Sequence, residues 1–215
     1  MRSYAAVLMV AVLSMSGCRG KMFPGGQGTA SEGPVSASAQ EAAQAGLTTL
    51  QSLVTQDNFQ GLGFSSVDQA KSAQLGDPMS LYSVRLDALT AYKGDADASG
   101  LVQDAHKTIY PVTAGQQVLS SVSVTQRPDG WRATDFGNSA LTRALVAHKQ
   151  STGDVVVWVP ALKIYFTSRG SGSAMMLTPI MDDPRFGLQA GEGMAASNVF
   201  GILQRGASGY NGLPQ

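Results

Sequence analysis

Oxygen-bearing side chains at alternate positions between residues 95 and 99 are the clearest sign of metal-binding chemistry in this chain. Asp95, Asp97 and Ser99 stand two residues apart, and Gly100 follows them. Carboxylate and hydroxyl oxygens are ligands that hard cations such as calcium take, and a glycine allows the sharp turn around the ion. A cluster of Asp, Ser and Gly is also typical of a solvated polar turn, so both interpretations stay open.

The spacing resembles the first two-thirds of an EF-hand calcium loop. The three residues just named take its first, third and fifth positions, and the glycine takes the sixth. The twelfth position, where an EF-hand has a bidentate Glu, holds His106. The resemblance therefore implies a calcium site without its strongest ligand. We expect either no cofactor or a weakly held calcium ion.

A second acidic cluster, Asp182 and Asp183, lies just before Pro184 and Arg185. Two carboxylates can hydrolyse a bond as acid and base, but neighbouring acids point to opposite sides of an extended chain. A turn in which one carboxylate pairs with Arg185 is therefore the alternative. The chain has two histidines and one cysteine, and it contains no Gly-x-Ser-x-Gly nucleophile motif. These observations favour a non-catalytic protein over a hydrolase that uses carboxylates brought together by folding.

Aromatic residues of the expected strands could line a ligand groove: Trp131, Trp158, Tyr165 and Phe166. Aromatic side chains in strands more often pack in the core, so the groove is one of two interpretations.

The composition excludes several classes of protein. The 215 residues carry 15 Lys and Arg against 15 Asp and Glu, so the formal net charge is zero, and 43% are hydrophobic. A nucleic-acid partner is not expected, because such proteins carry a basic surface. General disorder is not expected either, because the apolar fraction is too high. The length suits a single folded domain.

The first residues have the pattern of an export signal. Arg2 precedes an uncharged apolar run, residues 5–13, which is too short to span a bilayer as a permanent helix. Small residues, Ser16 and Gly17, then stand directly before Cys18, the only cysteine of the chain. This arrangement resembles the lipobox of bacterial lipoproteins, although Met15 stands where that motif usually has Leu. The alternative is an ordinary secretory signal with an unrelated cysteine.

The resemblance implies a signal peptide at residues 1–17 and lipid on the sulfur of Cys18, which becomes the first mature residue. Membrane lipid is then a partner, and the location is the bacterial cell envelope. Arg19 stands where an Asp would indicate retention in the inner membrane, so the outer membrane is favoured. Residues 18–37 are rich in Gly, Ser, Ala and Pro and are predicted to form a flexible tether behind the lipidated cysteine.

Residues 38–215 are predicted to form one α+β domain. Ser38 and Glu41 match a capping box that begins a helix of about 17 residues. Further helices are expected from Ser65 or Ser66, after Asn138, and over 193–205, while 86–92 could extend a strand or form a helical turn. Alternating and β-branched runs predict seven strands, at 80–86, 109–113, 118–126, 131–136, 155–159, 162–168 and 174–181.

The predicted hairpins favour an antiparallel sheet of about five to seven strands with helices packed on it. Together with the N-terminal resemblance, this predicts a lipid-anchored envelope protein that works by non-catalytic binding or structural association. Two alternatives remain: the hydrolase with fold-assembled carboxylates, and an inhibitor or chaperone-like module. The latter would present a sheet edge to an envelope protein partner.

Overall fold

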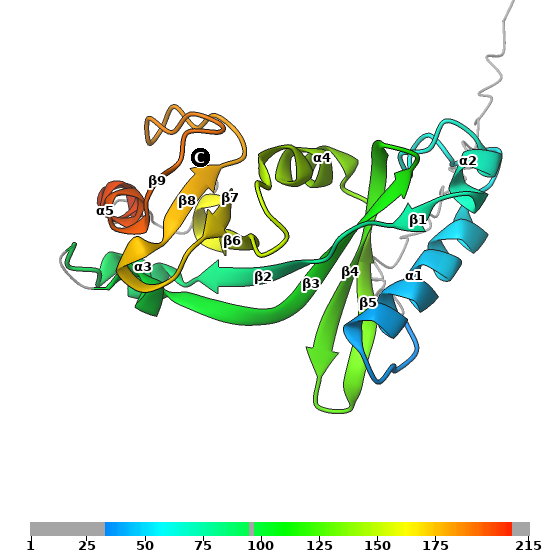
Figure 1. The fold of residues 1–215 in the computed structure, drawn as a ribbon, viewed down its shortest axis with the longest axis horizontal. Coiled ribbons are helices and arrows are strands. Elements are labelled where there is room, and N and C mark those ends of the chain that lie inside the picture. The colour runs from blue at the N-terminus through cyan, green and yellow to red at the C-terminus, as the bar shows by residue number, and fades with distance from the viewer. Residues whose placement is uncertain (1–32, 95–96, 208–215) are drawn as a thin grey trace, which may run out of the picture.

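The computed structural model describes residues 33–94 and 97–207 and has the expected α+β class (Figure 1). Nine strands form one sheet in the order β5-β4-β3-β2-β6-β7-β8-β9, and β1 pairs with β3. Their bounds are β1 Gln74–Leu75, β2 Met79–Val84, β3 Val102–Ala114, β4 Gln117–Arg127, β5 Gly130–Phe136, β6 Val155–Val159, β7 Ile164–Arg169, β8 Met176–Pro179 and β9 Met194–Ala195.

The expected count of five to seven strands is wrong. The seven predicted strands are all present, and the two additional ones, β1 and β9, contain two residues each. Two residues are too few to produce an alternating pattern, so no periodicity in the sequence indicates them.

The expectation of an antiparallel sheet holds for every neighbouring pair of described strands except β2 and β6, which are parallel. Leu81 to Ser83 pair with Val156 to Trp158 in the same direction. All other neighbouring strands are antiparallel, so the sheet consists of two antiparallel halves, β5-β4-β3-β2 and β6-β7-β8-β9. The single parallel pair joins these halves across a long connection that contains β3, β4, β5 and α4.

A bulge bends β3, the longest strand. Leu81 pairs with Lys107 and Tyr82 pairs with Asp104, so two residues of β3 have no partner in β2. One of them, His106, has a positive φ of 51°, and its amide donates to the Asp104 side chain at 2.7 Å. Beyond the bulge β3 pairs with β4, whereas before it β3 runs away from the β4–β5 hairpin (Figure 1).

The residues before the first helix lie along the outer edge of β5. Ser36 exchanges two backbone hydrogen bonds with Trp131, at 2.8 and 2.9 Å, and the Gly33 amide donates to the Ala133 carbonyl at 3.0 Å. Gly130, at the β4–β5 turn, has a φ of 135°, and an added Cβ would lie 2.8 Å from the Ser36 carbonyl oxygen. Residues 33–36, which the sequence placed in the tether, are therefore attached to the sheet.

Five α-helices cover the sheet: α1 Ala39–Leu53, α2 Val67–Lys71, α3 Leu86–Thr90, α4 Ser139–His148 and α5 Ala196–Ala207. Ser38 caps α1 by accepting from the Glu41 amide at 3.2 Å, as the capping box predicts. The ambiguous segment after β2 forms α3. No described helix is long and apolar enough to cross a membrane.

Three apolar clusters hold the layers together. The first packs α1 and α2 on β3–β5 and includes Leu47, Leu50, Val112 and Val122. The second packs α3 and α5 on β6–β8 and includes Leu89, Phe166, Phe200 and Leu203. The third lies between them under α4 and contains Met79, Leu81, Ile109, Leu145, Val156 and Ile180.

The two joining strands are buried on both faces. In β6, Val156 packs in the third cluster and Val157 in the second, so apolar side chains cover both faces of this strand. In β2, Leu81 is buried in the third cluster and Val84 in the second. Neither β2 nor β6 contains a charged residue, as expected for strands in the middle of a sheet.

Two helical glycines should respond to alanine in opposite directions. An added Cβ at Gly46 of α1 would lie 2.7 Å from the Val122 side chain and 2.9 Å from that of Ala133, whereas at Gly201 of α5 it would meet nothing within 4 Å. Alanine favours a helix by up to about 1 kcal/mol, but overpacking costs roughly 1–3 kcal/mol. We expect urea unfolding to show that Gly46→Ala lowers the free energy of unfolding and that Gly201→Ala raises it by about 0.5–1 kcal/mol.

If Gly46→Ala proved as stabilising as Gly201→Ala, the close packing of α1 on β4 and β5 would be contradicted.

A candidate binding cavity between the two halves of the sheet

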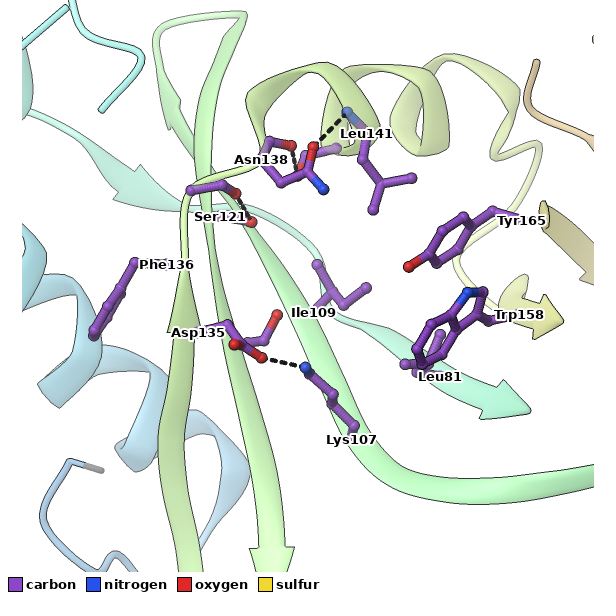
Figure 2. Close-up of a pocket in the computed structure, with 13 residues that line it drawn as sticks. Leu81, Lys107, Ile109, Ser121, Asp135, Phe136, Asn138, Leu141, Trp158 and Tyr165 are labelled. Atoms are coloured by element: carbon purple, nitrogen blue, oxygen red, sulfur yellow. Dashed lines mark hydrogen bonds and ion pairs between the residues drawn. The ribbon is translucent and has the colours of Figure 1, made fainter. Parts of the chain in front are cut away.

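A cavity of about 290 Å³ lies where the β4–β5 hairpin diverges from β2, β6 and β7, beside the N-terminal end of α4 (Figure 2). It is the place where the two antiparallel halves of the sheet face each other across the bend of β3. Its walls are formed by Leu81, Lys107, Ile109, Ser121, Ser123, Asp135, Phe136, Gly137, Asn138, Leu141, Thr142, Trp158 and Tyr165.

The wall formed by β4, β5 and the start of α4 is polar. Ser121 donates its hydroxyl hydrogen to the Gly137 carbonyl. Ser123 lies on the same strand and is only 8% exposed. Within the described part of the chain, its hydroxyl makes no hydrogen bond. The Ser123 hydroxyl is not among the fully buried atoms, so it offers an unused hydrogen-bonding group to whatever occupies the cavity.

Asn138 shapes the polar wall next to the helix. It adopts the left-handed conformation, with φ of 58°, and its side-chain oxygen caps α4 by accepting from the Leu141 amide at 3.2 Å. Its carbonyl accepts from the Thr142 hydroxyl at 3.0 Å. The side-chain amide nitrogen is then left without an acceptor among described residues, and Figure 2 shows it on the cavity side of the helix.

The opposite wall is apolar and aromatic. Trp158 of β6 and Tyr165 of β7 are cross-strand partners whose rings stack 5.5 Å apart at an interplanar angle of 7°. Leu81 and Ile109 complete this wall from β2 and β3. The Tyr165 hydroxyl points across the cavity toward the polar wall (Figure 2), and no described residue accepts from it. The groove interpretation therefore holds for these two aromatics.

The other two aromatics from the sequence prediction lie elsewhere. Phe166 is fully buried in the cluster under α5, and Trp131 packs at the border of the cluster under α1. Both serve as core residues, the alternative that the sequence left open.

One ion pair lies at the cavity wall. The Lys107 ammonium contacts the Asp135 carboxylate, and these are the two charged side chains that line the cavity. Because they neutralise each other, the wall carries no net charge. Burial, helped by the negative charge of Asp135, raises the pKa of Tyr165. The Tyr165 hydroxyl therefore remains protonated at neutral pH and can donate a hydrogen bond.

The predicted calcium loop is only partly visible. Asp97 caps a short 3₁₀-helix, Ala98–Leu101, by accepting from the Ser99 amide at 2.9 Å, which is the geometry of a polar turn. Asp95 lies outside the described residues, and the described ones contain no group of three or more metal-ligating side chains. Calcium binding by Asp95, Asp97 and Ser99 stays a prediction.

The acidic cluster after β8 is folded into a turn. The Arg185 guanidinium hydrogen-bonds Asp183 at 2.7 and 3.0 Å and thereby holds the pKa of that carboxyl below its usual value. Asp182 accepts from the Ala190 amide at 2.7 Å instead. The two carboxylates thus bind different partners, and neither lines the cavity.

The cavity residues that sequence analysis missed are Lys107, Ser123, Asp135 and Asn138. Ser123 and Asp135 lie in expected strands, where single polar residues give no signal. Lys107 precedes the expected strand 109–113, and Asn138 was identified only as a helix cap. Cys18 lies outside the described residues. Comparison of the chain with protein-family models, curated proteins and solved structures gave no match.

Asp154 holds the connection between α4 and β6. It is 5% exposed and accepts hydrogen bonds from the Gln150 amide at 2.7 Å, the Ser151 amide at 3.1 Å and the Ser151 hydroxyl at 2.6 Å. Burial alone would raise the pKa of Asp154, but these hydrogen bonds hold it below its usual value. The ionised carboxylate therefore stabilises the loop that leads from the cavity helix to the joining strand.

We expect Asp154→Asn to lower the free energy of unfolding by about 1–3 kcal/mol at pH 7, because an amide cannot accept all three bonds. The contribution of Asp154 is fully present above its unfolded pKa of about 3.9 and is lost as pH falls through the lower folded pKa. Urea unfolding at a series of pH values should show that the difference between wild type and variant shrinks below about pH 4. A difference that stayed constant to pH 2 would contradict this role.

Proposed function

We propose that this protein is lipid-anchored in the bacterial cell envelope, with the outer membrane favoured, and works by non-catalytic binding of a small ligand in the cavity. The observation that carries the binding proposal is the Ser123 hydroxyl, which lies in the cavity wall, remains accessible from the cavity and makes no hydrogen bond to a described residue. The Asn138 amide and the Tyr165 hydroxyl offer two further donors. A ligand that bonds these groups offsets the cost of their burial.

The state of the charged groups supports binding rather than proton transfer. Lys107 and Asp135 engage each other, and Asp182 and Asp183 are committed to a turn at another place in the fold. A general acid or base needs a free titratable group within reach of the reacting atoms. The cavity instead presents donors whose protons stay in place at neutral pH.

The anchor rests on the lipobox resemblance around Cys18. Since Gly33 is already bonded to β5, residues 19–32 are the chain available between the lipid and the sheet. Fully extended, these residues would reach at most about 50 Å. An anchor at Cys18 would therefore keep Gly33, and with it the outer edge of β5, within that distance of the membrane.

The sheet edge gives little support to the alternative function, an inhibitor or chaperone-like module. Residues 33–36 occupy the outer edge of β5. The large hydrophobic side chains exposed in the described ranges are separate in sequence and belong to different elements, Val35, Leu53, Val146 and Met181. A partner that adds a strand needs an open edge beside an apolar patch.

We expect Cys18→Ser to release the protein from the envelope. Wild type should incorporate labelled palmitate and sediment with membranes, because acyl chains on Cys18 contribute about 0.8 kcal/mol per buried methylene. The variant should lose the label and appear in the soluble fraction. Wild type without label in the cytosol would contradict the proposed anchor.

Ligand binding should change the fluorescence of Trp158. The chain has two tryptophans, so Trp131→Phe leaves Trp158 as the only reporter. We expect at least one of five ring-sized probes to shift its emission and to be recovered unchanged: glucose, phenol, benzoate, benzylamine and phenylalanine. Leu141→Phe, which adds bulk at the cavity wall, should abolish the shift, while the matched variant Val146→Phe, on the exposed side of α4, should retain it.

No shift with any probe would contradict the proposed binding function, and turnover of a probe would contradict its non-catalytic character.

A further inference from the structure

We infer that the ligand of this cavity is a neutral, hydroxyl-rich ring, a single sugar residue. The inference rests on the proposed binding function and deepens it by naming the chemical class. It is carried by three properties of the cavity together: the opposition of a polar and an apolar wall, the absence of net charge on the lining side chains, and the size.

The two walls match the two aspects of a sugar ring. On one side Trp158, Leu81 and Ile109 present apolar surface. On the other side, Figure 2 shows the Asn138 amide of the polar wall, and Ser123 of β4 lines the same cavity with a hydroxyl that bonds no described residue. A pyranose has a face of C–H groups and a rim of hydroxyls, so it can contact both walls at once. A purely aromatic ligand would leave the polar groups unbonded, which is costly in a buried site.

The charges of the lining residues disfavour an ionic ligand. Lys107 and Asp135 already contact each other. An anion would be attracted by Lys107 but repelled by Asp135, and a cation would meet the reverse situation. Either would compete with the existing contact between Lys107 and Asp135 and would meet no net charge on the wall to attract it. A neutral ligand can accept a hydrogen bond from the Tyr165 hydroxyl and leaves the pair of Lys107 and Asp135 intact.

The size limits the ligand to about one ring. The cavity of about 290 Å³ is at the lower end of the range for small-molecule sites, roughly 300–1,000 Å³. The same chemistry could come from a free monosaccharide or from the end of an envelope glycan. Because a free monosaccharide and a glycan end present the same ring, the experiment compares how tightly each of them binds.

The test uses the full chain with Trp131→Phe, solubilised in a detergent without a sugar headgroup, and follows Trp158 fluorescence. Four probes keep one ring and change its charge: glucose and N-acetylglucosamine are neutral, glucosamine is a cation and glucuronate an anion. We expect the neutral sugars to bind at least tenfold more tightly than either charged one. A short chain of N-acetylglucosamine units that binds more tightly than the monosaccharide would identify a glycan end as the source, and equal or weaker binding would identify the free sugar.

Removal of a single hydroxyl tests the geometry. Tyr165→Phe keeps the stack on Trp158 and should weaken sugar binding about 2- to 10-fold, and Ser123→Ala should do the same. The matched control Tyr110→Phe removes a hydroxyl in the cluster under α1 and should leave sugar affinity unchanged. Melting temperatures within a few degrees of wild type establish that each variant is folded.

The outcomes separate the ligand class from the binding function. Binding of benzoate, benzylamine or phenylalanine in the cavity, without binding of the neutral sugars, would overturn the sugar inference and leave the binding function in place. Equal affinity for glucose, glucosamine and glucuronate would overturn the argument from charge. Binding that survives both Tyr165→Phe and Ser123→Ala unchanged would also overturn the inference, because the sugar would then lie elsewhere.

Discussion

The parallel pairing of β2 with β6 is the contact on which the remaining architecture depends. It involves three residue pairs, yet it is the only ladder between the two antiparallel halves of the sheet. Without it, the aromatic wall of β6 and β7 would have no fixed position relative to the polar wall of β4 and β5. Backbone hydrogen bonds inside a sheet set distance and register together, so this short ladder determines the shape of the cavity.

The bend in β3 complements that ladder. Unpaired residues before Lys107 let the strand follow β2 at one end and β4 at the other. The strained conformation at His106 is therefore the local cost of an opening in an otherwise continuous sheet.

The sequence predicts the elements well and their assembly poorly. Seven strands, the capping box of α1 and the last helix follow from patterns within a few neighbouring residues, and each is present. The parallel pair, the bulge and the edge position of residues 33–36 depend on residues far apart in the chain, which local periodicity does not encode. The cavity could not be predicted from the sequence for the same reason, because Ser123 and Tyr165 come to line one cavity only after the two halves of the sheet join. Among the cavity residues, the sequence indicated only Trp158 and Tyr165, as aromatics that either line a groove or pack in the core.

The order of the strands along the chain has a consequence for synthesis on the ribosome. β2 emerges early, whereas its neighbour β6 is translated only after β3, β4, β5 and α4. During that interval the nascent chain can complete the N-terminal half of the sheet but leaves one side of β2 unpaired. Such a transient edge invites pairing with other chains, so a chaperone that shields β2 until β6 has been translated would protect the polypeptide from aggregation.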